Sequence, residues 1–143
     1  GCAREEAERL ATAEGLRQVL REREEEAVRL AQEEAQALKE GDFQKFLSLV
    51  NRSGQSSLMR LQNVFAPSQA KEQGITLALA LSQRLLQGQG ACRVHGGGFA
   101  GTIQAFVPLD ALEGFSAEVE AALGHGSCRA LSIRPVGGAV LWE

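Results

Sequence analysis

The sequence predicts an α+β fold in which helices pack on one face of a small antiparallel sheet. Residues 3–90 are rich in strong helix formers, and their apolar side chains recur at intervals of three and four residues. Residues 91–143 differ, because short β-prone runs alternate there with glycines, one amphipathic segment and turns. The predicted order is helices first, and then strand, loop, strand, helix and strand. With 143 residues and a hydrophobic content of 44%, the chain suits one domain spanning residues 1–143.

The first 40 residues predict helix, because residues 3–40 contain no proline and a single glycine, Gly15. Residues 21–26 are six consecutive charged side chains without an apolar face. They fit either a solvated turn of one long helix or a break between two helices, so residues 1–26 form one helix or a hairpin. Gly41 is predicted to cap the end of this element, and Asp42 the start of the next helix.

The remaining elements follow from apolar spacing and turn residues. A helix from residue 43 is predicted to break at residues 51–54, Asn-Arg-Ser-Gly. Ser68 is predicted to cap a further helix that contains Gly74, is apolar on most of its surface and is therefore well buried. A last helix is predicted at residues 109–123. Strands are predicted at residues 91–95, 102–107, 128–133 and 139–142.

Charge and cysteine content exclude several classes of protein. The formal net charge is -3, and a mildly acidic chain does not suit nucleic-acid binding. The three cysteines are irregularly spaced, which predicts neither a disulfide framework nor a zinc site, and Cys92 and Cys128 lie in apolar runs that predict burial. No apolar run approaches the roughly 18 residues of a membrane span, and the Glu-rich start differs from a secretory signal. We therefore expect a cytoplasmic protein without nucleic-acid or membrane partners.

The densest glycine cluster lies at residues 93–102, Arg-Val-His-Gly-Gly-Gly-Phe-Ala-Gly-Thr. Gly96, Gly98 and Gly101 form a literal G-x-G-x-x-G, which in a dinucleotide-binding fold opens a helix. Here a β-prone run follows and no Gly-Lys-Ser/Thr is present, so neither a Rossmann nor a Walker loop is predicted. The pattern predicts a strand–loop–strand whose glycines permit positive φ and a close approach to an anion or another backbone.

Residues 93–106 resemble the third conserved motif of the GHMP kinases, in the form found in a bacterial branch of galactokinases. The resemblance extends over roughly residues 27–142. In that family the C-terminal domain has an antiparallel α+β, ferredoxin-like fold, so the resemblance implies the same fold class. Further segments similar to the same branch are residues 37–43, 51–54, 61–64, 71–74 and 133–138.

The resemblance implies that the chain is the C-terminal domain of an enzyme that transfers the γ-phosphate of ATP, with Mg²⁺, to the anomeric hydroxyl of galactose. It also implies a loop on the substrate and phosphate side of the site, formed by His95, Gly96, Gly97, Gly98, Phe99, Ala100 and Gly101. The family's catalytic Asp, its basic partner and its ATP loop belong to the N-terminal GHMP half, and none occurs here. We therefore expect no catalytic residue, metal ligand or tightly bound cofactor on this chain, which is inactive without that half.

Roles can also be expected for three individual residues, His95, Arg93 and Arg134. His95 is the one titratable group of the loop, and a packing or hydrogen-bonding role is expected because no carboxylate partner is identifiable for it. Arg93 and Arg134 are expected to form ordinary surface pairs, with phosphate as the other option.

Two other classes of function remain open from the residues alone. The strand–loop–strand and its helix also suit a regulatory module that binds a small molecule or anion. Residues 3–40 suit a helical interaction protein, although their heptad pattern is poor. Because the chain begins Gly-Cys-Ala without Met, we expect either a processed start or a piece of a longer protein, whose exposed apolar face would favour self-association.

Overall fold

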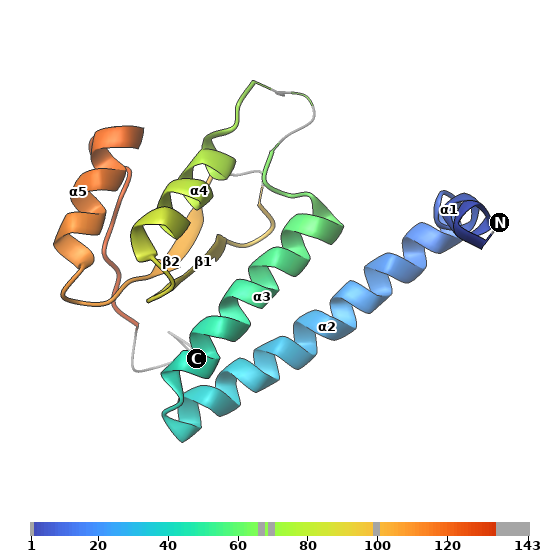
Figure 1. The fold of residues 1–143 in the computed structure, drawn as a ribbon, viewed down its shortest axis with the longest axis horizontal. Helices are drawn as coiled ribbons and strands as arrows, with labels where there is room; N and C mark the ends of the chain where they lie inside the picture. Colours follow the sequence, from blue (N-terminus) through green and yellow to red (C-terminus); the bar gives the residue numbers. More distant parts are fainter. Residues whose placement is uncertain (1, 66–67, 69–70, 99–100, 134–143) are drawn as a thin grey trace, which may run out of the picture.

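The computed structural model describes residues 2–65, 68, 71–98 and 101–133. This part of the chain forms five helices and a two-stranded antiparallel sheet, which confirms the α+β class (Figure 1). No helix in these residues combines the length and apolarity needed to cross a lipid bilayer. In chain order the elements are α1 (Cys2–Leu10), α2 (Ala13–Glu40), α3 (Phe43–Leu61), α4 (Gly74–Leu86), β1 (Ala91–Val94), β2 (Ile103–Phe106) and α5 (Leu112–Leu123).

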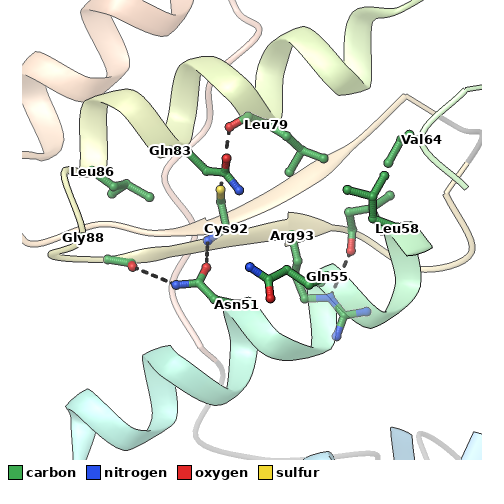
Figure 2. A pocket seen from close by; sticks show the side chains of 13 residues that line it. Asn51, Gln55, Leu58, Val64, Leu79, Gln83, Leu86, Gly88, Cys92 and Arg93 are labelled. Carbon is green, nitrogen blue, oxygen red and sulfur yellow. Dashed lines mark hydrogen bonds between the residues drawn. The ribbon is translucent and has the colours of Figure 1, made fainter. Parts of the chain in front are cut away.

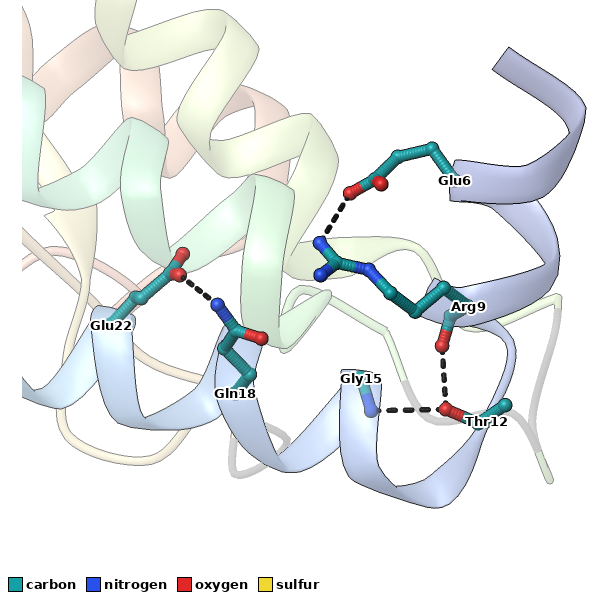
Figure 3. Close-up of polar contacts among 6 residues, drawn as sticks. All are labelled: Glu6, Arg9, Thr12, Gly15, Gln18 and Glu22. Atoms are coloured by element: carbon teal, nitrogen blue, oxygen red, sulfur yellow. Dashed lines mark hydrogen bonds and ion pairs between the residues drawn. The ribbon is translucent and has the colours of Figure 1, made fainter. Parts of the chain in front are cut away.

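The N-terminal region is two helices, and the break lies before the charged run rather than within it. Thr12 caps α2, because its Oγ1 accepts a hydrogen bond from the Gly15 N–H at 3.2 Å and donates one to the Arg9 carbonyl at 2.5 Å (Figure 3). Residues 21–26 continue as regular helix within α2. They do have a buried member, since Arg23 is 6% exposed and faces α3 through its bond to Ser57.

The turn between α2 and α3 follows the prediction. Gly41 adopts the left-handed conformation with φ of 72°, and its N–H donates to the carbonyls of the last turn of α2. The Asp42 carboxylate accepts a hydrogen bond from the Lys45 N–H at 3.0 Å and begins α3. The two helices then lie side by side and bury Leu30 against Leu49.

The predicted break at residues 51–54 is wrong, because α3 continues through them to Leu61. These small and polar residues have a packing role instead. A Cβ added to Gly54 would lie 2.9 Å from the Cβ of Arg93, so glycine here lets α3 approach β1 closely. Ser53 is buried on the same side of α3 and accepts a hydrogen bond from the Arg93 guanidinium.

Helices cover both faces of the β1–β2 hairpin rather than one face, and Figure 2 shows α4 and α3 on opposite sides of β1. On the α4 side, Cys92 packs with Leu86 of α4 and with Phe115 of α5. On the α3 side, Phe106 meets Phe46 edge to face, with ring centroids 5.1 Å apart. The alternation of side chains along each strand divides the core in this way.

Two other expectations fail for local reasons. The helix predicted from Ser68 begins at Gly74, and Leu77 on its outer surface is 60% exposed, so α4 is not buried all round. Residues 128–133 form no strand, and Leu131 is 92% exposed. The predicted final strand at residues 139–142 lies outside the described residues, as does Arg134.

Candidate functional site

The β1–β2 hairpin carries the glycine loop, in the strand–loop–strand context that the sequence predicts. The ladder pairs Val94 with Ile103, and the His95 N–H extends it by donating to the Thr102 carbonyl at 3.1 Å. The chain then reverses, with positive φ at Gly96 (61°), Gly98 (76°) and Gly101 (83°). The hairpin thus holds the loop at both of its ends.

The loop rests on the segment that follows α3, at Asn63. A Cβ on Gly98 would lie 2.1 Å from the Asn63 carbonyl oxygen, which is closer than side chains approach a backbone atom. One residue earlier, the Gly97 carbonyl accepts a hydrogen bond from Asn63 Nδ2 at 3.3 Å. Main chain and side chain of a single asparagine therefore both meet the loop.

Asn63 is buried, with 2% of the residue exposed, and the residue that follows it, Val64, packs with Ile75 and Val94. Its Oδ1 is buried without a hydrogen-bond partner in the described structure. Sequence reasoning identified residues 61–64 through the resemblance and gave Asn63 no role, because a contact 34 residues away along the chain has no local signal.

The predicted loop residues face solvent to different degrees. His95, Gly96, Gly97 and Gly101 are exposed and Gly98 is half-buried, while Phe99 and Ala100 lie outside the described residues. Within the described part of the chain, the exposed His95 side chain makes no hydrogen bond or ion pair, so the packing or hydrogen-bonding role expected for it is not seen there. His125, in a later turn, is 98% exposed and lies 3.3 Å from Glu120.

Arg93 lies at the base of the loop and points away from it, toward α3. Its Nη1 donates to Ser53 Oγ, and its Nε donates to the Val94 carbonyl at 3.2 Å. Burial lowers the pKa of the Arg93 guanidinium, and the charge of the Glu34 carboxylate opposes that shift. The expectation of an ordinary surface pair is wrong, because the half-buried Arg93 connects β1 with α3.

A second polar cluster, formed by Glu26, Ser56 and Arg60, joins α2 to α3. Glu26 accepts a hydrogen bond from the Ser56 hydroxyl and lies 3.3 Å from Arg60. The Ser56 hydrogen bond, followed by the charges of Arg60, Arg52 and Arg23, lowers the pKa of Glu26 against the opposing effect of burial. These contacts hold the two helices together and lie on the far side of β1 from α4.

A cleft of about 350 Å³ lies along the free edge of β1, between α3 and α4 (Figure 2). Asn51 lies at one end and pairs with β1 as a neighbouring strand would. Its Nδ2 donates to the Gly90 carbonyl at 3.4 Å, and its Oδ1 accepts from the Cys92 N–H at 3.2 Å. The side chains of Gln55, Gln83 and Arg93 add further polar groups to a lining that also contains apolar residues such as Leu58, Leu79 and Leu86.

Across residues 2–65, 68, 71–98 and 101–133, no three His, Cys, Asp or Glu side chains converge as a metal site. The loop offers main-chain amides in a left-handed turn, an arrangement that suits contact with an anion or with a second surface.

Comparison with known proteins finds no match for this chain among protein-family models, curated proteins or solved structures.

Proposed function

We propose that this chain is the C-terminal part of a galactokinase-like GHMP kinase, in which residues 95–101 form one wall of the active site. The complete enzyme would transfer the γ-phosphate of ATP to the anomeric hydroxyl of galactose in the cytoplasm. The N-terminal GHMP half would hold Mg²⁺ and ATP and supply the catalytic Asp.

One observation carries this proposal: separate segments that resemble the same family meet in the fold. Residues 61–64 and 93–106 are about 30 positions apart in the sequence, and they touch where Asn63 bonds to Gly97. Residues 51–54 touch the same hairpin, since Gly54 packs on Arg93. Segments that resemble one family and also assemble around one hairpin support a shared function for that hairpin and its loop.

The contribution of this chain to the reaction follows from the loop itself. Gly96, Gly97 and Gly98 carry no side chains, so the peptide N–H groups of this stretch can approach substrate or phosphate oxygens. A wall of main chain also excludes water from a transferring phosphoryl group. Arg93 supports the loop from the strand side, because its hydrogen bonds to Ser53 and Val94 fix the end of β1 where the loop begins.

A hybrid enzyme tests the proposal. In a galactokinase, residues 27–142 of this chain replace the corresponding C-terminal region, and galactose-dependent ADP release is measured. We expect activity from the hybrid, and none from the present chain alone. A folded hybrid without activity would refute the proposal, as would galactose-dependent ADP release by the chain alone.

The cleft beside β1 favours a second candidate, a regulatory module that binds a small molecule. Its volume of about 350 Å³ and the amides of Gln55 and Gln83 suit a small polar ligand. Calorimetry with amino acids, galactose and ATP separates the two functions. Tight amino-acid binding that is weakened by Gln83→Ala and unaffected by sugar would support the module.

A further inference from the structure

We propose that Asn63 is the positioning residue of the glycine loop, and that it fixes Gly97 and Gly98 in the conformation the active site needs. The contact with the loop stands on the geometry alone. Its importance for catalysis rests on the proposed function. Asn63 itself touches no reacting atom in this assignment.

Asn63 holds the loop at two consecutive residues by different means. Its Nδ2 donates to the Gly97 carbonyl at 3.3 Å, which sets the orientation of the peptide between Gly97 and Gly98. Its main-chain carbonyl oxygen lies only 2.1 Å from the position that a Cβ on Gly98 would occupy. The side chain thus attracts the loop, and the main chain limits how closely it can approach.

The end of α3 places Asn63 for this task. Gln62 has a positive φ of 49°, and its N–H donates to the Ser57 carbonyl at 3.2 Å, which ends the helix. The chain therefore turns sharply one residue before Asn63. Asn63 is held from both sides, by the cap of α3 and by the apolar packing of Val64 against Val94.

Core stability does not explain an asparagine at this position. The side chain is 2% exposed and its Oδ1 has no partner in the described structure, so the fold carries a buried, unpaired acceptor. A leucine, which has the same number of side-chain heavy atoms and the same branching, would remove that acceptor. Replacement by leucine would, however, remove the Nδ2 donor that bonds to the Gly97 carbonyl of the loop.

Nuclear magnetic resonance on the full 143-residue chain tests the assignment through Asn63→Leu and Asn63→Asp. Both variants keep the number of side-chain heavy atoms and lose the Nδ2 donor. We expect the Gly97 carbonyl carbon shift to move in both variants. Order parameters at Gly96, Gly97 and Gly98 should also fall, from about 0.85 toward about 0.6.

Asn51→Ala is the matched control, because Asn51 is another asparagine that bonds to main chain, at Gly90 and Cys92. It should alter the Cys92 amide signal and leave the glycines of the loop unchanged. General loosening of the fold would affect Cys92 and the loop alike in every variant. That outcome, or a loop unchanged in Asn63→Leu, would overturn the proposal.

Activity of the hybrid enzyme separates this proposal from the proposed function. Asn63→Leu in the hybrid should lower kcat by roughly a hundredfold, as expected for a misplaced active-site wall, with little change in the KM for galactose. Loop signals that respond as expected while kcat stays unchanged would refute the loop as an active-site wall, and with it the role in catalysis. A hybrid that never shows activity refutes the proposed function and leaves the loop measurement to decide the role of Asn63.

Discussion

Alanine substitutions at three successive glycines of the loop should differ in their effect on stability, because their surroundings differ. Among the described residues, no atom lies within 4 Å of a Cβ added to Gly97, and its φ is not positive. Gly96 is equally open but has a φ of +61°. Gly98 combines a φ of +76° with the close approach to Asn63. The series therefore separates backbone strain from steric overlap within one loop.

The structure sets the expected magnitudes. Gly97→Ala should be neutral or stabilising by up to about 1 kcal/mol, because alanine restricts the unfolded chain. Gly96→Ala should destabilise by about 1–2 kcal/mol, the usual penalty of a left-handed conformation. In Gly98→Ala the Cβ must move from 2.1 Å to at least 3.4 Å from the Asn63 oxygen, a displacement of 1.3 Å. That shift also breaks the Asn63–Gly97 hydrogen bond, so a loss of about 2–3 kcal/mol follows.

Urea unfolding followed by circular dichroism measures the series, with the denaturant slope checked for each variant so that midpoints can be compared. The expected order of stability is Gly97→Ala above Gly96→Ala above Gly98→Ala. Equal losses for Gly97→Ala and Gly98→Ala would refute the close contact with Asn63. A Gly98→Ala variant no less stable than Gly96→Ala would show that only backbone strain matters.

Other predictions concern the edge of β1 and the acidic residues of α2. Asn51→Ala removes two hydrogen bonds to β1 and should lower the free energy of unfolding by about 1–3 kcal/mol. Exposed Gln55→Ala should change it by less than about 0.5 kcal/mol in the same urea assay. The pKa of Glu26 is lowered, so its ionised form stabilises the fold above about pH 4.3, and this is lost as pH falls through the lowered value. Glu26→Gln should flatten the acid side of the stability curve; an unchanged curve would contradict this. Burial raises the pKa of Glu34, so its protonated form favours the folded state, and this contribution to stability is lost as pH rises through the raised pKa. Glu34→Gln should remove this fall in stability with rising pH.

Local signals in the sequence predict local structure well. Gly41 and Asp42 mark the turn between α2 and α3 because each satisfies backbone groups only a few residues away. The strand–loop–strand around the glycines follows in the same way, since strand patterning and loop residues are adjacent in the chain. Such features depend on neighbours within one turn or one hairpin.

Features that depend on partners far away in the chain could not be predicted from the sequence. Residues 51–54 look like a break because Gly and Ser favour turns, yet the approach of β1 to Gly54 requires a small residue within a helix. Residues 128–133 have β-prone side chains, but a strand needs a ladder partner, and none forms within the described chain. The role of Asn63 depends on a loop 34 residues later.

The burial of Cys92 gives the molecule a built-in chemical reporter. The thiol is 4% exposed, its sulfur lies 4.0 Å from the Leu79 carbonyl of α4, and burial raises the pKa of the thiol. A neutral, enclosed thiol does not react with alkylating reagents. Modification of Cys92 therefore requires the packing around β1 to open, whereas half-buried Cys128 is more accessible. The labelling rate at Cys92 thus reports how often the packing around β1, the strand that leads into the glycine loop, opens.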